Sequence, residues 1–236
     1  MNTGTLYLIP VPLGPGAPDA VLPPPVLEFI RPLAHFVVEN AKSARAFLKA
    51  VGTTLPLQEL QLQELNEHTR GDALEGLLQP LLAGKDVGLI SEAGCPAVAD
   101  PGADLVALAQ RKGIRVAPMV GPSSILLALM ASGLNGQRFA FHGYLPAKEP
   151  ERQKSLQNLE ADSRKHKQTQ IFIETPYRNR QMLEGLLKAC QPSTRITIAT
   201  DLTLPGESIV TRTVAQWKKE TPPDIERRPT VFLLLA

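Results

Sequence analysis

The sequence predicts an α/β fold made of two α/β domains. Short apolar runs alternate with segments of helical spacing along the chain, a pattern typical of strand–helix–strand units. The 236 residues are 43% hydrophobic and 20% charged, which suits a globular protein with a sizeable core. Two half-size domains, 1–118 and 119–236, account for the number of elements better than one very large sheet would.

In the first half, apolar runs end in loops that are rich in small or polar residues. The strands are expected at 6–11, 35–38, 57–65, 87–90 and 114–119. Amphipathic spacing predicts helices at 26–30, 43–51, 72–82 and 103–112, and a more apolar one that ends near Gly133. Ser43 can cap the second of these helices, and Gly52, Gly84 and Gly113 can end helices in a left-handed turn.

The second half continues the alternation. Strands are expected at 138–143, 170–173, 196–200 and 231–235, and helices at 147–168, 179–190 and 213–217. The first of these helices is highly charged, and its outer face is interpreted as a solvated surface. Residues 201–207 are expected to form a loop.

The interpretation of the chain starts from the stretch 86–133, because it predicts a strand, a loop and a helix followed by a second strand, loop and helix. Strands joined by a helix run parallel, so the loops SEAGCPAVADPG and VGPSS should share one sheet edge. Their glycines allow close approach to the backbone, and the following helix N-termini offer N–H donors. Both loops lack Lys and Arg. They indicate a ligand-binding edge, although ordinary tight turns would give the same pattern.

Composition excludes several classes of protein. The net charge of +2 permits a nucleic-acid partner without arguing for one. Cys95 and Cys190 have neither metal-binding nor disulfide-framework spacing, which favours a reducing cytoplasm and no metal. We expect no signal peptide, since the start lacks a basic segment followed by a long apolar one. No apolar run approaches the roughly 20 residues that span a membrane. Neither G-x-G-x-x-G nor a Walker motif is present.

Several motifs in the same order resemble the tetrapyrrole methylase superfamily, and within it the ribosomal RNA small subunit methyltransferase I branch. SEAGCPAVADPG is similar to that branch's SDAGTPLISDPG, VGPSS to PGPSA, and ASGL is identical. LYLIPVPLG resembles LYLVATPIG, NEHT resembles HEHN, FHGYLP resembles FEGFLP, FIETPYR resembles FYESPHR, and ATDLTLPGE resembles ARELTKLHE. The likeness covers most of the chain.

The resemblance implies two α/β domains of the tetrapyrrole methylase type with S-adenosylmethionine in a cleft between them, usually in a homodimer, and no metal. Carried over position by position, it implies a set of cofactor-binding residues: Pro12, Leu13, Glu92, Gly94, Cys95, Val98, Ser123 and Ser124. Small residues would let the cofactor lie against backbone. Cys95 is interpreted as a small residue that lines a pocket and not as a nucleophile, because no His is paired with it in the sequence.

Methyl transfer to a ribose hydroxyl requires a base that takes the hydroxyl proton. Glu39, Glu67 and His68 are the candidate groups, because each follows an expected strand, and Glu39 or Glu67 is expected to be the base or the group that orients it. A Glu at a strand end also often caps the next helix, and His68 can be a structural hydrogen-bonding residue. Arg45 and Arg178 are the candidates that would hold a substrate phosphate.

Three functions remain open at this point. The first is 2′-O-ribose methylation of small-subunit ribosomal RNA. The second is methylation of a tetrapyrrole or another small molecule, and the third is cofactor binding without RNA methylation. The branch carries basic residues where this chain has Thr200 and Leu204, and KGE where it has Arg228, Pro229 and Thr230. Fewer basic groups than in that branch would therefore be available to contact an RNA backbone.

Overall fold

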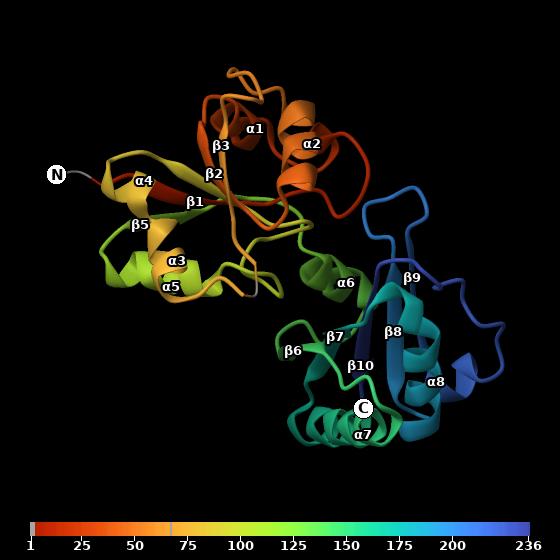
Figure 1. Cartoon of the computed structure of the whole chain (residues 1–236). Helices are drawn as coiled ribbons and strands as arrows, with labels where there is room; N and C mark the ends of the chain where they lie inside the picture. Colours follow the sequence, from red (N-terminus) through yellow and green to blue (C-terminus); the bar gives the residue numbers. More distant parts are fainter. Residues whose placement is uncertain (1–2, 67) are drawn as a thin grey trace. The chain divides into compact units, whose positions relative to one another are not determined.

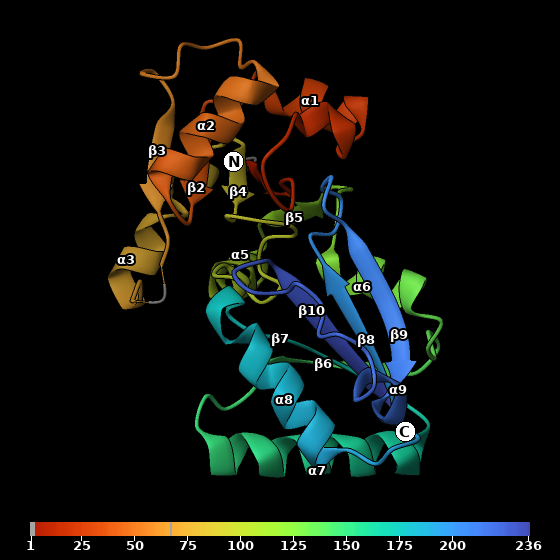
Figure 2. The same ribbon diagram turned by 90° about the vertical axis from the view of Figure 1, so that its right-hand side faces the viewer.

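The chain folds into two compact units, each with its own five-stranded sheet. The computed structural model describes residues 3–66 and 68–236. The units are Met1–Ser123 and Ser124–Ala236. Figure 1 colours the first unit from red to green and the second from green to blue, and Figure 2 shows the same elements after a quarter turn.

The first unit has an all-parallel sheet, as the strand–helix alternation predicted. Its order is β3-β2-β4-β1-β5, from the strands β1 Thr5–Ile9, β2 His35–Val38, β3 Gln61–Glu64, β4 Val87–Ile90 and β5 Arg115–Pro118. The central strand β4 is buried along its whole length. A Cβ on its Gly88 would lie 2.5 Å from Ile9 Cδ1 and 2.8 Å from Phe36 Cδ1, so glycine permits this close packing.

The helical segments among the described residues of this unit are η1 Pro18–Ala20, α1 Pro24–Ile30, α2 Ala41–Val51, α3 Gly71–Gly76, α4 Gln79–Leu82 and α5 Ala103–Arg111. Asn40, and not the expected Ser43, caps α2: its Oδ1 accepts the N–H groups of Lys42 (2.9 Å) and Ser43 (3.3 Å). The expected single helix at 72–82 is two helices, because Pro80 lacks an N–H and fits only the first turn of a new helix.

The second unit has a mixed sheet. Its order is β6-β7-β10-β8-β9, from the strands β6 Phe139–Tyr144, β7 Thr169–Ile173, β8 Arg195–Thr200, β9 Ser208–Thr213 and β10 Thr230–Leu235. Only β6 and β7 are parallel, while the other three pairings are antiparallel. The sequence did not predict β9, whose six residues pair with β8 along the edge of the sheet.

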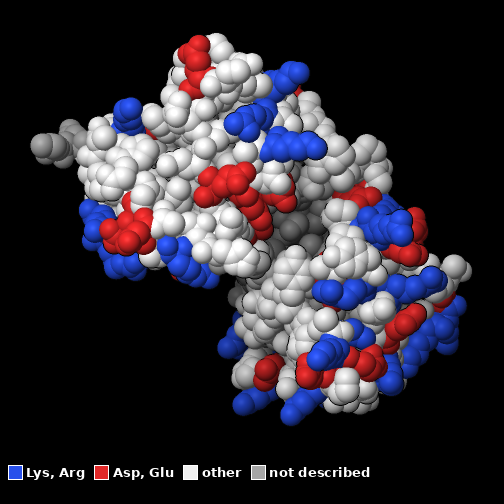
Figure 3. Space-filling model, in the orientation of Figure 1, with Lys and Arg blue, Asp and Glu red and all other residues white. Residues whose placement is uncertain are grey.

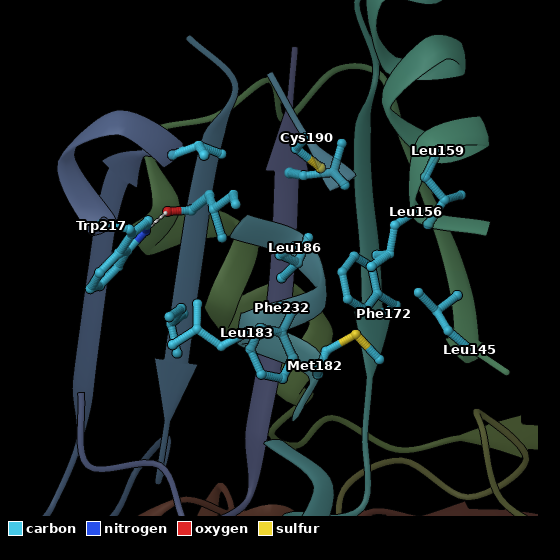
Figure 4. Packing of buried hydrophobic residues seen from close by; sticks show 14 of the residues in the cluster. Leu145, Leu156, Leu159, Phe172, Met182, Leu183, Leu186, Cys190, Trp217 and Phe232 are labelled. Atoms are coloured by element: carbon cyan, nitrogen blue, oxygen red, sulfur yellow. Dashed lines mark hydrogen bonds between the residues drawn. The ribbon is translucent and has the colours of Figure 1, made fainter. Parts of the chain in front are cut away.

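The helices of this unit are α6 Ser124–Ser132, α7 Glu149–His166, η2 Pro176–Arg178, α8 Asn179–Ala189 and α9 Val214–Trp217. Figure 4 shows Met182, Leu183 and Leu186 of α8 packed on the sheet near Phe172 and Phe232. These two rings stack with their centroids 5.8 Å apart. Trp217 donates its indole N–H to Ile196 O at 3.0 Å (Figure 4).

None of the helices in the described part of the chain combines the length and apolar character needed to cross a bilayer.

Candidate functional site

The carboxyl edge of the parallel sheet brings together three loops of the first unit. Val11, after β1, and Gly94, after β4, exchange backbone hydrogen bonds of 2.9 and 3.1 Å. The thiol of Cys95 donates to the carbonyl oxygen of Pro122, after β5, at 3.4 Å. The two unusual loops therefore lie at one edge, as predicted, and the loop after β1 joins them.

The loop between β4 and α5 is compact because its backbone turns repeatedly into the left-handed region. Gly94 has a φ of +70°, and a Cβ there would lie 3.2 Å from Leu13 Cδ2. Ala97 and Ala99 adopt φ values of +66° and +63°, which are uncommon for residues with a side chain. Backbone and small side chains thus form this surface.

Four acidic residues line a cavity of about 610 Å³ at the same edge, and three of them are not paired with Arg70. These three are Glu39 directly after β2, Glu92 at the start of the β4 loop, and Asp100 near its end, while Asp104 is the fourth. Glu39 Oε2 accepts the backbone N–H of Glu92 at 3.1 Å, and Ser43 Oγ donates to Glu92 Oε1 at 3.2 Å. Arg70 also lines the cavity, where it pairs with Asp104 at 3.2 Å. The cavity is therefore acidic.

Asp100 is the carboxyl group most affected by this environment. Burial raises its pKa from 3.8 to about 6; the charges of Glu39 and Glu92 act in the same direction, and a hydrogen bond with Ser91 opposes them. Burial and Asp100 also raise the pKa of Cys95, so this thiol resists ionisation. Sequence reasoning missed Asp100. Its position in the ADPG turn before α5 was the available signal.

Replacing Asp100 by Asn is expected to stabilise the protein at pH 7.5 but not at pH 4. Between its ordinary pKa of 3.8 and its folded pKa of about 6, the folded chain holds a proton that the unfolded chain has released. The free energy of unfolding therefore falls as pH rises through this window. Asp100→Asn removes this loss, on the order of 1 kcal/mol for a group that solvent partly screens. Urea denaturation at both pH values measures the difference, and a gain independent of pH would contradict the argument.

A second hollow of about 340 Å³ lies beside the loop after β1. Two of the predicted cofactor residues, Pro12 and Glu92, line it with Ser43 and Phe47 of α2. Gly14, Pro15 and Gly16 also line this hollow, where glycine leaves backbone groups accessible. Glu92 therefore lines both hollows.

The remaining predicted residues are distributed over both units. Val98 is 47% exposed on the β4 loop, and Ser123 ends the loop after β5. Ser124 opens α6 in the second unit. Arg45 is exposed on α2. Glu67 lies outside the described residues, so its role stays a prediction.

Arg178 lies in the second unit, where it is bound to a buried acid. Its Nε and Nη2 donate to Glu174 Oε1 at 3.0 and 2.6 Å. The Glu174 side chain is inaccessible to solvent and Arg178 is partly exposed. Hydrogen bonding and charge attraction from Glu174 raise the pKa of Arg178, so the guanidinium stays charged. Sequence reasoning missed Glu174, because its burial depends on the tertiary fold.

Several residues that differ from the family motifs make contacts within the protein. Thr200 is buried, and its hydroxyl lies 3.2 Å from the hydroxyl of Thr230. Arg228 pairs with Asp201 Oδ2 at 2.8 Å and donates to Gly206 O at 2.5 Å. Pro229 O accepts the N–H of Asp201 at 3.0 Å. These contacts join the loops at 201–207 and 224–230.

Charge is distributed unevenly over the surface. On the face in Figure 3, acidic side chains gather on the first unit with Lys and Arg beside them, while the second unit carries many interspersed Lys and Arg. Within the described ranges, no group of His, Cys, Asp and Glu is arranged to hold a metal ion.

A parallel sheet whose small-residue loops meet at its carboxyl edge is typical of an α/β protein that binds a ligand there. The chain belongs to the tetrapyrrole (corrin/porphyrin) methylases, whose family model matches residues 6–217. It is thereby a methyltransferase.

Curated relatives resemble the chain over most of its length. It is 32% identical to ribosomal RNA small subunit methyltransferase I of Escherichia coli O157:H7, over 100% of this chain and 78% of that protein. The protein of the same name from Pseudomonas aeruginosa is 34% identical over 89% of this chain and 70% of its own.

Solved structures share the fold. The methyltransferase CobJ has a TM-score of 0.62 at 21% identity, with 100% of this chain and 94% of that chain covered. Uroporphyrin-III C-methyl transferase from Thermus thermophilus, complexed with S-adenosyl homocysteine, has a TM-score of 0.55 at 17% identity, with 98% and 97% covered.

Proposed function

We propose that this protein transfers a methyl group from S-adenosylmethionine to a ribose 2′-hydroxyl of small-subunit ribosomal RNA. The observation that carries the proposal is the 32% identity along the whole chain to a relative named as a small-subunit ribosomal RNA methyltransferase. The loops at the carboxyl edge of the first unit supply a suitable site.

The residues at that edge fit the cofactor. S-adenosylmethionine carries a sulfonium and an ammonium group, and when bound it supplies an electrophilic methyl group. Glu39, Glu92 and Asp100 give the cavity the opposite charge. We assign the cofactor to the predicted set: Pro12, Leu13, Glu92, Gly94, Cys95, Val98, Ser123 and Ser124. Glycine backbone and short side chains in these loops leave room for an adenosyl group.

The same edge supplies the candidate base. Glu39 lies directly after β2 in the acidic cavity, and Glu67 follows β3 in the sequence. One of them takes the proton of the ribose hydroxyl while the other orients it, and Asp100 adds a third carboxylate beside Glu39. Arg45 and Arg178 hold substrate phosphates, with Glu174 keeping the Arg178 guanidinium in place.

The protein is proposed to act as a homodimer in the cytoplasm, without a membrane partner. Helix α6 offers an apolar surface for a second copy, since Leu126 is 50% and Met130 is 78% exposed one turn apart. Both cysteines are free thiols, which suits a reducing compartment.

Calorimetric titration with S-adenosylmethionine tests the cofactor site. Wild-type protein is expected to bind, and Ser123→Trp is expected to weaken binding at least about tenfold, because an indole would fill the small-residue loop after β5. Ser193→Trp places the same side chain in an exposed turn of the second unit and should bind as wild type does. Equal binding by Ser123→Trp would remove this loop from the site. No binding by folded wild type would overturn the proposal.

Methylation of a tetrapyrrole is the second candidate, favoured by fold similarity to CobJ and to cobalt precorrin-4 methyltransferase. Assays with labelled cofactor on small-subunit ribosomal RNA and on uroporphyrin III separate the two. Cofactor binding with turnover on neither substrate would support a binding protein without methylation activity.

A further inference from the structure

The turn after β7 presents an exposed aromatic ring beside an arginine. Tyr177 is 71% exposed, whereas the large apolar side chains of the adjoining core are buried. The Arg178 guanidinium carbon lies 6.0 Å from the centroid of the Tyr177 ring, at the outer limit of cation–π attraction. The chemistry assigned above gives Tyr177 no role.

The backbone under this ring is held in place on several sides. The N–H of Arg178 donates to Thr175 O at 2.9 Å, and that of Arg227 donates to Pro176 O at 3.1 Å. The next residue, Asn179, is fully buried and donates Nδ2 to Ile225 O at 2.8 Å and to Arg228 O at 2.7 Å. A ring on such a turn loses little conformational freedom when a ligand covers it.

The charges beside the ring suit a polyanion. Glu174, whose Oε2 accepts no hydrogen bond from the described residues, holds the arginine through Oε1 alone and fixes its guanidinium. Arg227, whose backbone is bonded to this turn, and Arg180 have exposed side chains. A second aromatic residue, Tyr144, is 58% exposed and close enough to Arg178 to influence its pKa.

We propose that Tyr177 and Arg178 form a platform on which one unpaired RNA base stacks while the arginine contacts a neighbouring phosphate. This inference rests on the proposed function and deepens it: the substrate would be recognised as a single-stranded segment. Bases in a duplex are already stacked on each other, so an exposed tyrosine gains little from them. A surface that bound only the phosphates of a duplex would need the arginine side chains but not the Tyr177 ring.

Fluorescence anisotropy with a single-stranded RNA of roughly 12 nucleotides, and with the same strand in a duplex, tests the platform. Tyr177→Leu is expected to weaken binding of the single strand about five- to 100-fold and to leave duplex binding nearly unchanged. Tyr177→Phe keeps the ring and should bind as wild type does. Arg180→Ala is the matched control for charge, and it should weaken both RNAs to a similar, smaller extent.

The inference is overturned if Tyr177→Leu binds the single strand as wild type does, or if wild type binds the duplex at least as tightly. Methylation of small-subunit ribosomal RNA, measured with the same proteins, distinguishes the two proposals. If wild type methylates this RNA and Tyr177→Leu does so equally well, only the platform fails. If single-strand binding depends on Tyr177 but no ribosomal RNA is methylated, the platform stands and the proposed function fails.

Discussion

Glu39→Gln is expected to lower the turnover number of methyl transfer by about 10²- to 10⁴-fold, the usual contribution of a general base. The amide oxygen of Gln can still accept the N–H of Glu92, which Glu39 Oε2 accepts at 3.1 Å, so the β4 loop should keep its position. What the variant loses is the capacity to take a proton. Single-turnover assays at saturating cofactor measure this step separately from binding.

Glu64→Gln provides a matched control for that measurement. Glu64 ends the neighbouring strand β3 and accepts the N–H of Ala41 at 3.2 Å, but it is not among the described residues that line the acidic cavity. It should turn over as wild type does. Glu67→Gln tests the other candidate. Full activity in both Glu39→Gln and Glu67→Gln would rule out the assignment, and a loss confined to Asp100→Asn would move the base to Asp100.

Gly121→Ala is expected to destabilise the first unit and to weaken cofactor binding by more than about tenfold. A Cβ at this position would lie 2.3 Å from Pro10 Cβ, 2.7 Å from Pro10 Cγ and 3.0 Å from Leu22 Cδ2. The Pro10 ring is fixed to the backbone after β1, so the loop that ends in Ser123 must move instead. Overpacking of this kind costs about 1–3 kcal/mol, or a fall in Tm of roughly 3–10 °C.

Gly76→Ala in the same unit is the matched control, because it makes the same Gly-to-Ala change at a position without a steric clash. A Cβ on Gly76 meets nothing within 4 Å, and the residue ends α3. Its Tm should stay the same or rise slightly, because Ala favours the helix. Thermal denaturation and calorimetry on both variants give the comparison. A Gly121→Ala protein that melts and binds as wild type does would show that the two loops can separate without cost.

The first half of the fold could be predicted because its signals are local. A buried parallel strand such as β4 is a continuous apolar run in the sequence, and the loops after β1, β4 and β5 are rich in small residues. Parallel pairing then places those loops at one edge, and the link between Gly94 and Val11 shows that it does. These loop motifs, together with the motifs of the second half, predicted the family, and the match over residues 6–217 confirmed it.

The strand order of the second unit could not be read from the sequence. Its strand β9 carries Thr and Arg on a sheet edge, where one face needs no apolar residues, so it has little periodic signal. The antiparallel pairing of β10 with both β7 and β8 depends on contacts between residues far apart in the chain. Such contacts cannot be predicted from the local pattern of hydrophobic residues.

The sequence by itself determined the α/β class, the parallel half of the fold, the loops at its edge and the methylase family. Only the tertiary structure decided that Asp100 shares a cavity with Glu39 and Glu92, and that Glu174 is buried beneath Arg178. The physical reason is the same in both cases. A pKa and an ion pair depend on burial and on charges from distant segments, whereas periodicity records only which face of its own element a residue occupies.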